Sequence, residues 1–127
     1  MKGINSKAAN VINLPAPERY SYFIRKVADF EEVWGLYNEG WALLEDKGDR
    51  MLAFWPEAEF AELCTSDVWK NYTPKKISID DFTEKWLEGM KKDGTDAVIF
   101  LTPGQKGIIV SAQQLLDDLK EELAQYE

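Results

Sequence analysis

An unbroken run of apolar residues at positions 97–101 constrains the fold of this chain more than any other feature of its sequence. Turn-forming residues bound the run on both sides, with Gly94 before it and Pro103 and Gly104 after it. A short apolar run of this kind is typical of a β-strand that is covered on both faces. After the turn, residues 108–110 are again apolar, and we expect them to form a second strand that runs back alongside the first.

Helical periodicity is clearest after Pro17, a residue that suits the first turn of a helix. Apolar residues then recur at spacings of three and four, which places on one helical face Tyr20, Phe23, Ile24 and Val27. Further helices are expected over residues 57–64, from 78 or 80 to 93, and from 111 onward. Two serines have the spacing of helix N-caps, Ser78 and Ser111.

Between the first two helices, short apolar and aromatic segments alternate with glycine-containing turns. These segments are residues 33–37, 41–44 and 51–55. Strands joined by such turns form an antiparallel meander. A brief edge strand is also expected at residues 76–79. Together with the later hairpin and about four helices, this order predicts an α+β fold with a mostly antiparallel sheet. How the meander and the hairpin pair with each other stays open.

The length of the chain, 127 residues, is typical of one domain spanning residues 1–127. Pro15 and Pro17 separate a short N-terminal segment, residues 1–16, from the first main helix. We expect this segment either to dock on the body of the domain, with a helical turn or two over residues 6–14, or to be flexible.

Charge and composition exclude several classes of protein. There are 15 Lys and Arg against 23 Asp and Glu, which gives a formal net charge of −8. An acidic surface repels nucleic acids and anionic membranes, and no stretch approaches the ~20 apolar residues of a membrane span. One cysteine and no histidine exclude an internal disulfide, a zinc finger and catalysis by a Ser–His or Cys–His pair. A lone thiol without an export signal indicates the cytoplasm.

From about Pro17 onward, a series of short motifs spans nearly the whole chain. In order they are RYSYFI at 19–24, VAD at 27–29, EVWGL at 32–36, GWA at 40–42, WP at 55–56, Ala61, Cys64, DF at 81–82 and KWL at 85–87, before a closing acidic helix. In this order they resemble the small bacterial proteins grouped as domain of unknown function 2750. The resemblance implies no activity, substrate or catalytic residue, because none is assigned to that family. More loosely, the pattern is similar to the SseB-type domain of bacterial secretion and immunity proteins.

The sequence contains no recognisable set of catalytic residues. Its serines lie outside any G-x-S-x-G elbow, and Cys64 falls on the inner side of its expected helix, where a free cysteine behaves as a small hydrophobe. Adjacent carboxylates such as Asp117 and Asp118 are typical of a solvated surface. Residues 103–107 contain two glycines and a lysine but open no helix, which indicates a hairpin turn and not a phosphate cradle. We therefore expect no catalytic residue, no metal site and no cofactor.

Four residues are candidates for partner binding. Trp69 and Tyr72 lie in a polar loop beside Lys70, and exposed Trp and Tyr anchor many protein interfaces. The alternative is that they fold back over the edge of the core. Arg19 and Asp29 flank the first main helix, where a structural ion pair or cap contact is favoured over a ligand contact. The remaining tryptophans are interpreted as core residues: Trp34, Trp41, Trp55 and Trp86.

These features favour a non-catalytic cytoplasmic module that binds another protein, of which an immunity or regulatory protein would be one instance. Residues 111–127 contain five acids against Lys120, and this charge suits a basic protein partner. Two other classes stay open. One is a histidine-free enzyme that uses carboxylates or a divalent metal, and acids converging in a pocket would favour it. The other is a homo-oligomer, such as a homodimer, that pairs through a sheet edge or an aromatic loop.

Overall fold

The computed structural model describes residues 6–66 and 69–126 of the chain. Its helices are α1 (Ser6–Ile12), α2 (Ala16–Phe30), α3 (Ala58–Glu62), α4 (Ile79–Asp81), α5 (Leu87–Asp93) and α6 (Ala112–Ala124), with a π-helical turn (Phe82–Trp86) joining α4 to α5. Its strands are β1 (Glu32–Tyr37), β2 (Leu43–Asp46), β3 (Asp49–Phe54), β4 (Thr73–Ser78), β5 (Asp96–Ile99) and β6 (Ile108–Val110). The predicted fold class, α+β with mostly antiparallel pairing, is confirmed.

The strands form a pair, β1–β4, and a four-stranded sheet in the order β2-β3-β5-β6. Strands β3 and β5 run parallel, with Phe54 opposite Ile99, whereas the other neighbours are antiparallel. A single bridge between Trp34 and Trp55 joins β1 to the end of β3. Parallel neighbours need a long crossover connection, and here α3, β4 and the helices from α4 to α5 lie between them in the chain.

The predicted meander forms only in part. Its last two strands pair as the hairpin β2–β3, but β1 pairs with β4 along its whole length. After β1 the chain makes an isolated bridge between Tyr37 and Trp41, and from Leu43 it pairs with β3. The brief edge strand expected at residues 76–79 is in fact the six-residue β4. The pairing of β1 with β4 joins segments that are far apart in the sequence, which local turn signals do not report.

Most helices begin and end where their sequence signals indicate. The side-chain oxygens of Ser78 and Ser111 accept backbone N–H groups of Asp81 and Gln114, each at 3.1 Å, so both predicted N-caps are confirmed. The expected helix over residues 57–64 is shorter and forms α3. Residues 6–14 contain the expected helical turns as α1, whose Val11 is buried in the core. None of the helices in residues 6–66 and 69–126 is long and apolar enough to cross a membrane.

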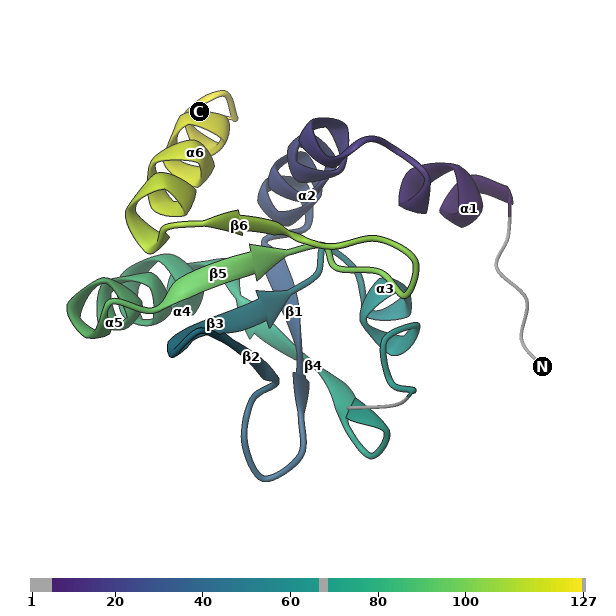
Figure 1. Ribbon diagram of the computed structural model, residues 1–127. Helices are drawn as coiled ribbons and strands as arrows, with labels where there is room; N and C mark the ends of the chain where they lie inside the picture. The colour runs from purple at the N-terminus through teal and green to yellow at the C-terminus, as the bar shows by residue number, and fades with distance from the viewer. Residues whose placement is uncertain (1–5, 67–68, 127) are drawn as a thin grey trace.

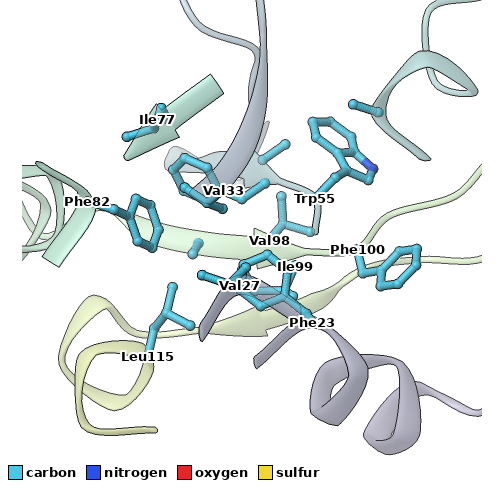
Figure 2. Close-up of a cluster of buried hydrophobic side chains, with 14 of the residues drawn as sticks. Phe23, Val27, Val33, Trp55, Ile77, Phe82, Val98, Ile99, Phe100 and Leu115 are labelled. Carbon is cyan, nitrogen blue, oxygen red and sulfur yellow. The ribbon is translucent and has the colours of Figure 1, made fainter. Parts of the chain in front are cut away.

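Strand β5 lies at the centre of the core, as the apolar run predicted. Figure 1 shows α2 and α6 beside β6, with the β1–β4 pair on the other side of β5. In Figure 2, Ile99 lies among Phe23 and Val27 of α2, whereas Val98 lies on the side of Val33 and Trp55. Both faces of β5 are therefore buried. The strand ends before Phe100, two residues earlier than the apolar run, because the backbone changes direction there.

Candidate functional site

The parallel strands β3 and β5 end side by side, and both arrowheads in Figure 1 point toward α3. The chain continues from β5 into residues 100–107, which form the turn before β6. In open α/β sheets, ligands bind outside the carboxyl ends of parallel strands, because the loops that follow them gather there. We call residues 100–107, together with Arg19, the turn site.

The turn site begins with an unusual backbone conformation. Phe100 has a φ of 55°, in the left-handed region that bulky residues rarely adopt. Its ring is fully buried and packs against Phe60 at 4.9 Å and Tyr22 at 6.0 Å between ring centroids. Such a conformation costs on the order of 1–3 kcal/mol and persists only where the surrounding structure imposes it. Here the buried ring imposes it.

The carbonyl of Leu101 accepts two side-chain hydrogen bonds within the turn site. Trp55 Nε1 donates at 2.7 Å and the Cys64 thiol at 3.3 Å. Burial raises the pKa of the Cys64 thiol to about 11, although the hydrogen bond with Trp55 opposes this shift. The thiol is therefore protonated at neutral pH and is a poor nucleophile, in keeping with the prediction that Cys64 is a core residue.

Two hollows flank the turn site. One has a volume of about 390 Å³ and is lined by Ile12, Asn13, Leu63, Thr102, Pro103, Gly104 and Gln105. The other has a volume of about 240 Å³ and lies beside Cys64, Trp69 and Leu101. Both share Thr102 and Pro103, so the turn forms a ridge between them.

Arg19 is buried behind this ridge, with 1% of its surface exposed. Its Nη1 donates to Leu14 O at 3.0 Å and to Gln105 Oε1, and its Nη2 donates to Lys106 O at 2.7 Å. Burial lowers the pKa of the guanidinium, which nevertheless remains a cation. In the described part of the chain, no carboxylate oxygen lies within 4.0 Å of it, and its Nε has no hydrogen-bond partner.

A second concave region, the α2–α6 groove, lies between these two helices and has a volume of about 340 Å³. Its walls are formed by Tyr20, Ser21, Ile24 and Arg25 of α2 and by Asp118, Glu121, Glu122 and Gln125 at the end of α6. The Tyr20 hydroxyl donates to Asp118 Oδ2, and Gln114 Nε2 donates to Asp118 Oδ1 at 2.9 Å. Burial, together with this carboxylate, raises the pKa of Tyr20, so its hydroxyl stays a hydrogen-bond donor. Two donors therefore hold the Asp118 carboxyl group in place.

The structure does not bring together the four residues predicted to bind a partner. Trp69 is only 6% exposed and packs edge-to-face against Trp55 at 5.9 Å, so the prediction that it is exposed is wrong. Tyr72 is half-buried against the core. Both therefore fit the alternative, in which they cover the edge of the core. Asp29 is exposed near the end of α2, about 15 Å along the helix axis from Arg19. Arg19 makes structural contacts, but these are with carbonyl oxygens and not with an acid.

Three aromatic side chains form a row at the edge of the core, an arrangement that the sequence did not predict. Trp41 packs edge-to-face against Tyr37 at 5.1 Å and against Trp86 at 4.7 Å, and the ammonium of Lys75 lies 4.3 Å from the centre of the Tyr37 ring. Trp34, Trp41 and Trp86 are half-buried, so their predicted core position is confirmed only in part, whereas Trp55 is fully buried. Gly35 packs directly against the Trp41 ring. A Cβ at this position would approach the ring to 2.9 Å, so the close contact requires glycine.

The sequence also did not reveal the contacts of Gln105 and Asp118. Gln105 lies 86 positions from Arg19, and no local pattern reports such a contact. For Asp118, the spacing of four residues from Gln114 was an available signal, because side chains at this spacing meet on a helix.

The fold and these two regions define the chain as an α+β protein with a mixed central sheet. A family model described as "Protein of unknown function (DUF2750)" matches residues 20–119, and the chain belongs to this family. The resemblance found in the sequence is thereby confirmed, whereas the looser likeness to SseB-type domains stays a prediction. A search of curated proteins found no match.

Proposed function

We propose that this protein is a non-catalytic module that binds a basic segment of another protein in the α2–α6 groove. One observation carries the proposal: the carboxylates of Asp118, Glu121 and Glu122 line the same groove. Among the residues that the structure describes, no Lys or Arg nitrogen lies within 4.0 Å of any of these carboxylates. Arg25 lines the same groove without pairing with these carboxylates, and arginine or lysine side chains of a partner would supply the further positive charge that three carboxylates require.

The opposite wall of the groove adds contacts of a different kind. Tyr20 and Ile24 of α2 line it, so apolar surface lies beside the acidic wall. Tyrosine is enriched among the residues that contribute most to binding energy at interfaces. A segment that alternates basic and apolar side chains would therefore complement both walls.

Two further features support binding over catalysis. Acid–base catalysis by paired carboxylates requires one of them to be desolvated, and no Asp or Glu of the described residues is buried. The Cys64 thiol is buried and protonated, which disfavours a cysteine nucleophile. We accordingly place the protein among binding modules of the immunity or regulatory type. A cytoplasmic location is part of the proposal, because a buried free thiol suits a reducing compartment.

The proposal can be tested by titrating the protein with a short peptide of alternating arginine and leucine, followed by NMR of backbone amides. We expect shifts at α2 and α6, and affinity that falls as salt is added. The double variant Glu121→Gln, Glu122→Gln should bind about tenfold more weakly, because two charge pairs are lost.

The matched control is Glu45→Gln, Asp46→Asn, which removes two exposed charges from the β2–β3 hairpin and leaves the groove intact. This control should bind the peptide nearly as well as the natural protein. An equal loss in both double variants would mean that only net charge attracts the peptide. That result, or shifts located away from the groove, would overturn the proposal.

One observation favours self-association as a second candidate function. Strand β6 lies at an edge of the four-stranded sheet, and its Ile109 is 59% exposed. An open edge with an exposed apolar side chain can pair with the same edge of a second copy. Light scattering at two protein concentrations tests this candidate. The mass should rise with concentration in the natural protein but not in Ile109→Lys, and a monomer at both concentrations would contradict it.

A further inference from the structure

Arg19 is deeply buried and has no acidic partner among residues 6–66 and 69–126. A buried charge is normally paired, because its transfer from water is costly unless an opposite charge or a full set of hydrogen bonds replaces the water. Arg19 donates hydrogen bonds to three neutral oxygen atoms, and its Nε has no partner among the residues that the structure describes. The guanidinium is thus neither charge-compensated nor fully hydrogen-bonded within the described residues.

The side chain of Gln105 links this cation to the larger hollow of the turn site. Its Oε1 accepts from Arg19 Nη1, its Nε2 donates to Ile12 O at 2.6 Å, and the residue itself lines the hollow. A glutamine amide presents one neutral oxygen to the guanidinium. A carboxylate in its place would present two charged oxygens, and the two terminal Nη groups of arginine bind such a pair in parallel.

From these contacts we infer that Arg19 is a binding site for the carboxylate of a small organic acid, which enters through the larger hollow and displaces the Gln105 side chain. The inference is independent of the α2–α6 groove. Gln105 then has the role of a neutral substitute that holds the cation while no acid is bound.

The lining of the hollow indicates what the rest of the ligand must be. Ile12, Leu63 and Pro103 offer apolar surface, whereas Asn13 and Thr102 offer hydrogen-bonding groups. A volume of about 390 Å³ lies at the lower end of the range of ligand pockets. A short branched aliphatic acid suits both the size and the apolar lining. The C-terminal carboxylate of a peptide ending in leucine has the same chemistry.

The sharpest test uses the variant Gln105→Ala, which removes the neutral substitute and leaves Arg19 without one acceptor. Sodium isovalerate should raise the thermal unfolding midpoint of this variant by about 3–5 °C at a tenfold excess over its dissociation constant. Isovaleramide with sodium chloride at the same ionic strength should not. The matched control is Gln113→Ala, because Gln113 is an exposed glutamine on α6, and it should show only the smaller acid-specific rise of the natural protein, in which Gln105 competes with the acid for Arg19.

Binding to the natural protein is followed by NMR of the Arg19 Nε–H and the Gln105 side-chain amide. Isovalerate up to about 20 mM, which covers dissociation constants in the millimolar range, should shift both signals in a saturable way. The variant Arg19→Lys should bind at least about tenfold more weakly, because lysine lacks the planar pair of donors. The control Arg25→Lys should bind normally.

A second arm compares N-acetyl-glycyl-leucine with its C-terminal amide. Tighter binding of the peptide acid than of isovalerate would identify a chain terminus as the source of the carboxylate, and the reverse would identify a free acid. Either result supports the site. The inference is overturned if acid and amide stabilise Gln105→Ala equally and neither acid shifts the Arg19 signal. Both measurements can be made even if Arg19→Lys does not fold.

Discussion

The turn site and the α2–α6 groove contain charges of opposite sign in opposite environments, and none of these charges forms an ion pair within the described residues. In the turn site, the Arg19 cation is buried and held by three oxygen atoms that carry no charge. In the groove, Asp118, Glu121 and Glu122 line an open hollow where water reaches their surroundings. Both regions include residues of α2, so one helix contributes to two very different electrostatic settings.

This difference shows that the burial of a charged residue, more than the sign of its charge, decides how much it contributes to stability. An exposed charge is solvated by water and changes stability little when it is removed. A buried charge depends on specific partners, and its removal leaves those partners without a donor or acceptor. The turn site should therefore be sensitive to substitution, whereas the groove should tolerate it and respond mainly in binding.

Substituting two arginines of α2, one buried and one exposed, tests this difference most directly. Arg19→Met leaves three acceptors unpaired and should lower the free energy of unfolding by about 3 kcal/mol. Arg25→Met, at the exposed wall of the groove, should change it by less than about 0.5 kcal/mol. Urea denaturation of both variants measures the difference. Equal stability of the two variants would show that the buried contacts of Arg19 contribute nothing.

Two glycines of the turn provide the next largest effect. A Cβ at Gly107 would approach Val98 Cγ2 to 2.6 Å and the backbone oxygen of Ile99 to 2.9 Å, whereas nothing lies within 4 Å of one at Gly104. Because backbone atoms of β5 cannot move aside easily, Gly107→Ala should cost about 2 kcal/mol. Gly104→Ala should be nearly neutral. The same urea titration compares them, and a neutral Gly107→Ala would mean that the turn is not pressed against the sheet.

Local signals predicted much of the fold. The buried face of α2 and the Ser78 and Ser111 caps follow from spacings of three or four residues, and the side chains concerned meet within one turn of helix. Strand β5 followed from its unbroken apolar run. The sequence did not predict which strands pair with β1 and β5. Strand β1 pairs with β4 and β5 pairs in parallel with β3, and both pairings join segments that are distant in the sequence.

The candidate sites were less predictable than the fold, and for the same physical reason. Trp69 lies in a polar stretch of sequence, yet Trp55 and the core edge bury it. Trp41 lies in an apolar stretch but remains half-buried. Arg19 was predicted to flank the first main helix but lies within α2, and its contacts with residues 105 and 106 arise only when the chain folds. A side chain's type was readable from sequence, and its surroundings were not.

The hydrogen bond between Tyr20 and Asp118 should give an intermediate effect in the groove. Tyr20→Phe removes it and should lower the free energy of unfolding by about 1 kcal/mol near neutral pH. Because burial and Asp118 raise the pKa of Tyr20 above its ordinary 10.0, this stabilisation is fully present below pH 10 and is lost as the pH rises further. Unfolding of the variant should therefore depend less steeply on pH above 10. The Tyr22–Glu57 hydrogen bond should leave some alkaline dependence in both proteins, and identical slopes would contradict the assignment.

The smallest effect is expected for the groove carboxylates themselves. Glu121→Gln with Glu122→Gln removes two like charges from one helix end near Asp118, so repulsion falls and nothing is left unpaired. Stability should rise by no more than about 0.5 kcal/mol at low salt, and the gain should vanish at high salt because screening already weakens the repulsion. Urea denaturation at the two salt levels measures this. A loss of stability would show that these acids pair with cations inside the protein, and the groove would then resemble the turn site, where charge serves the fold.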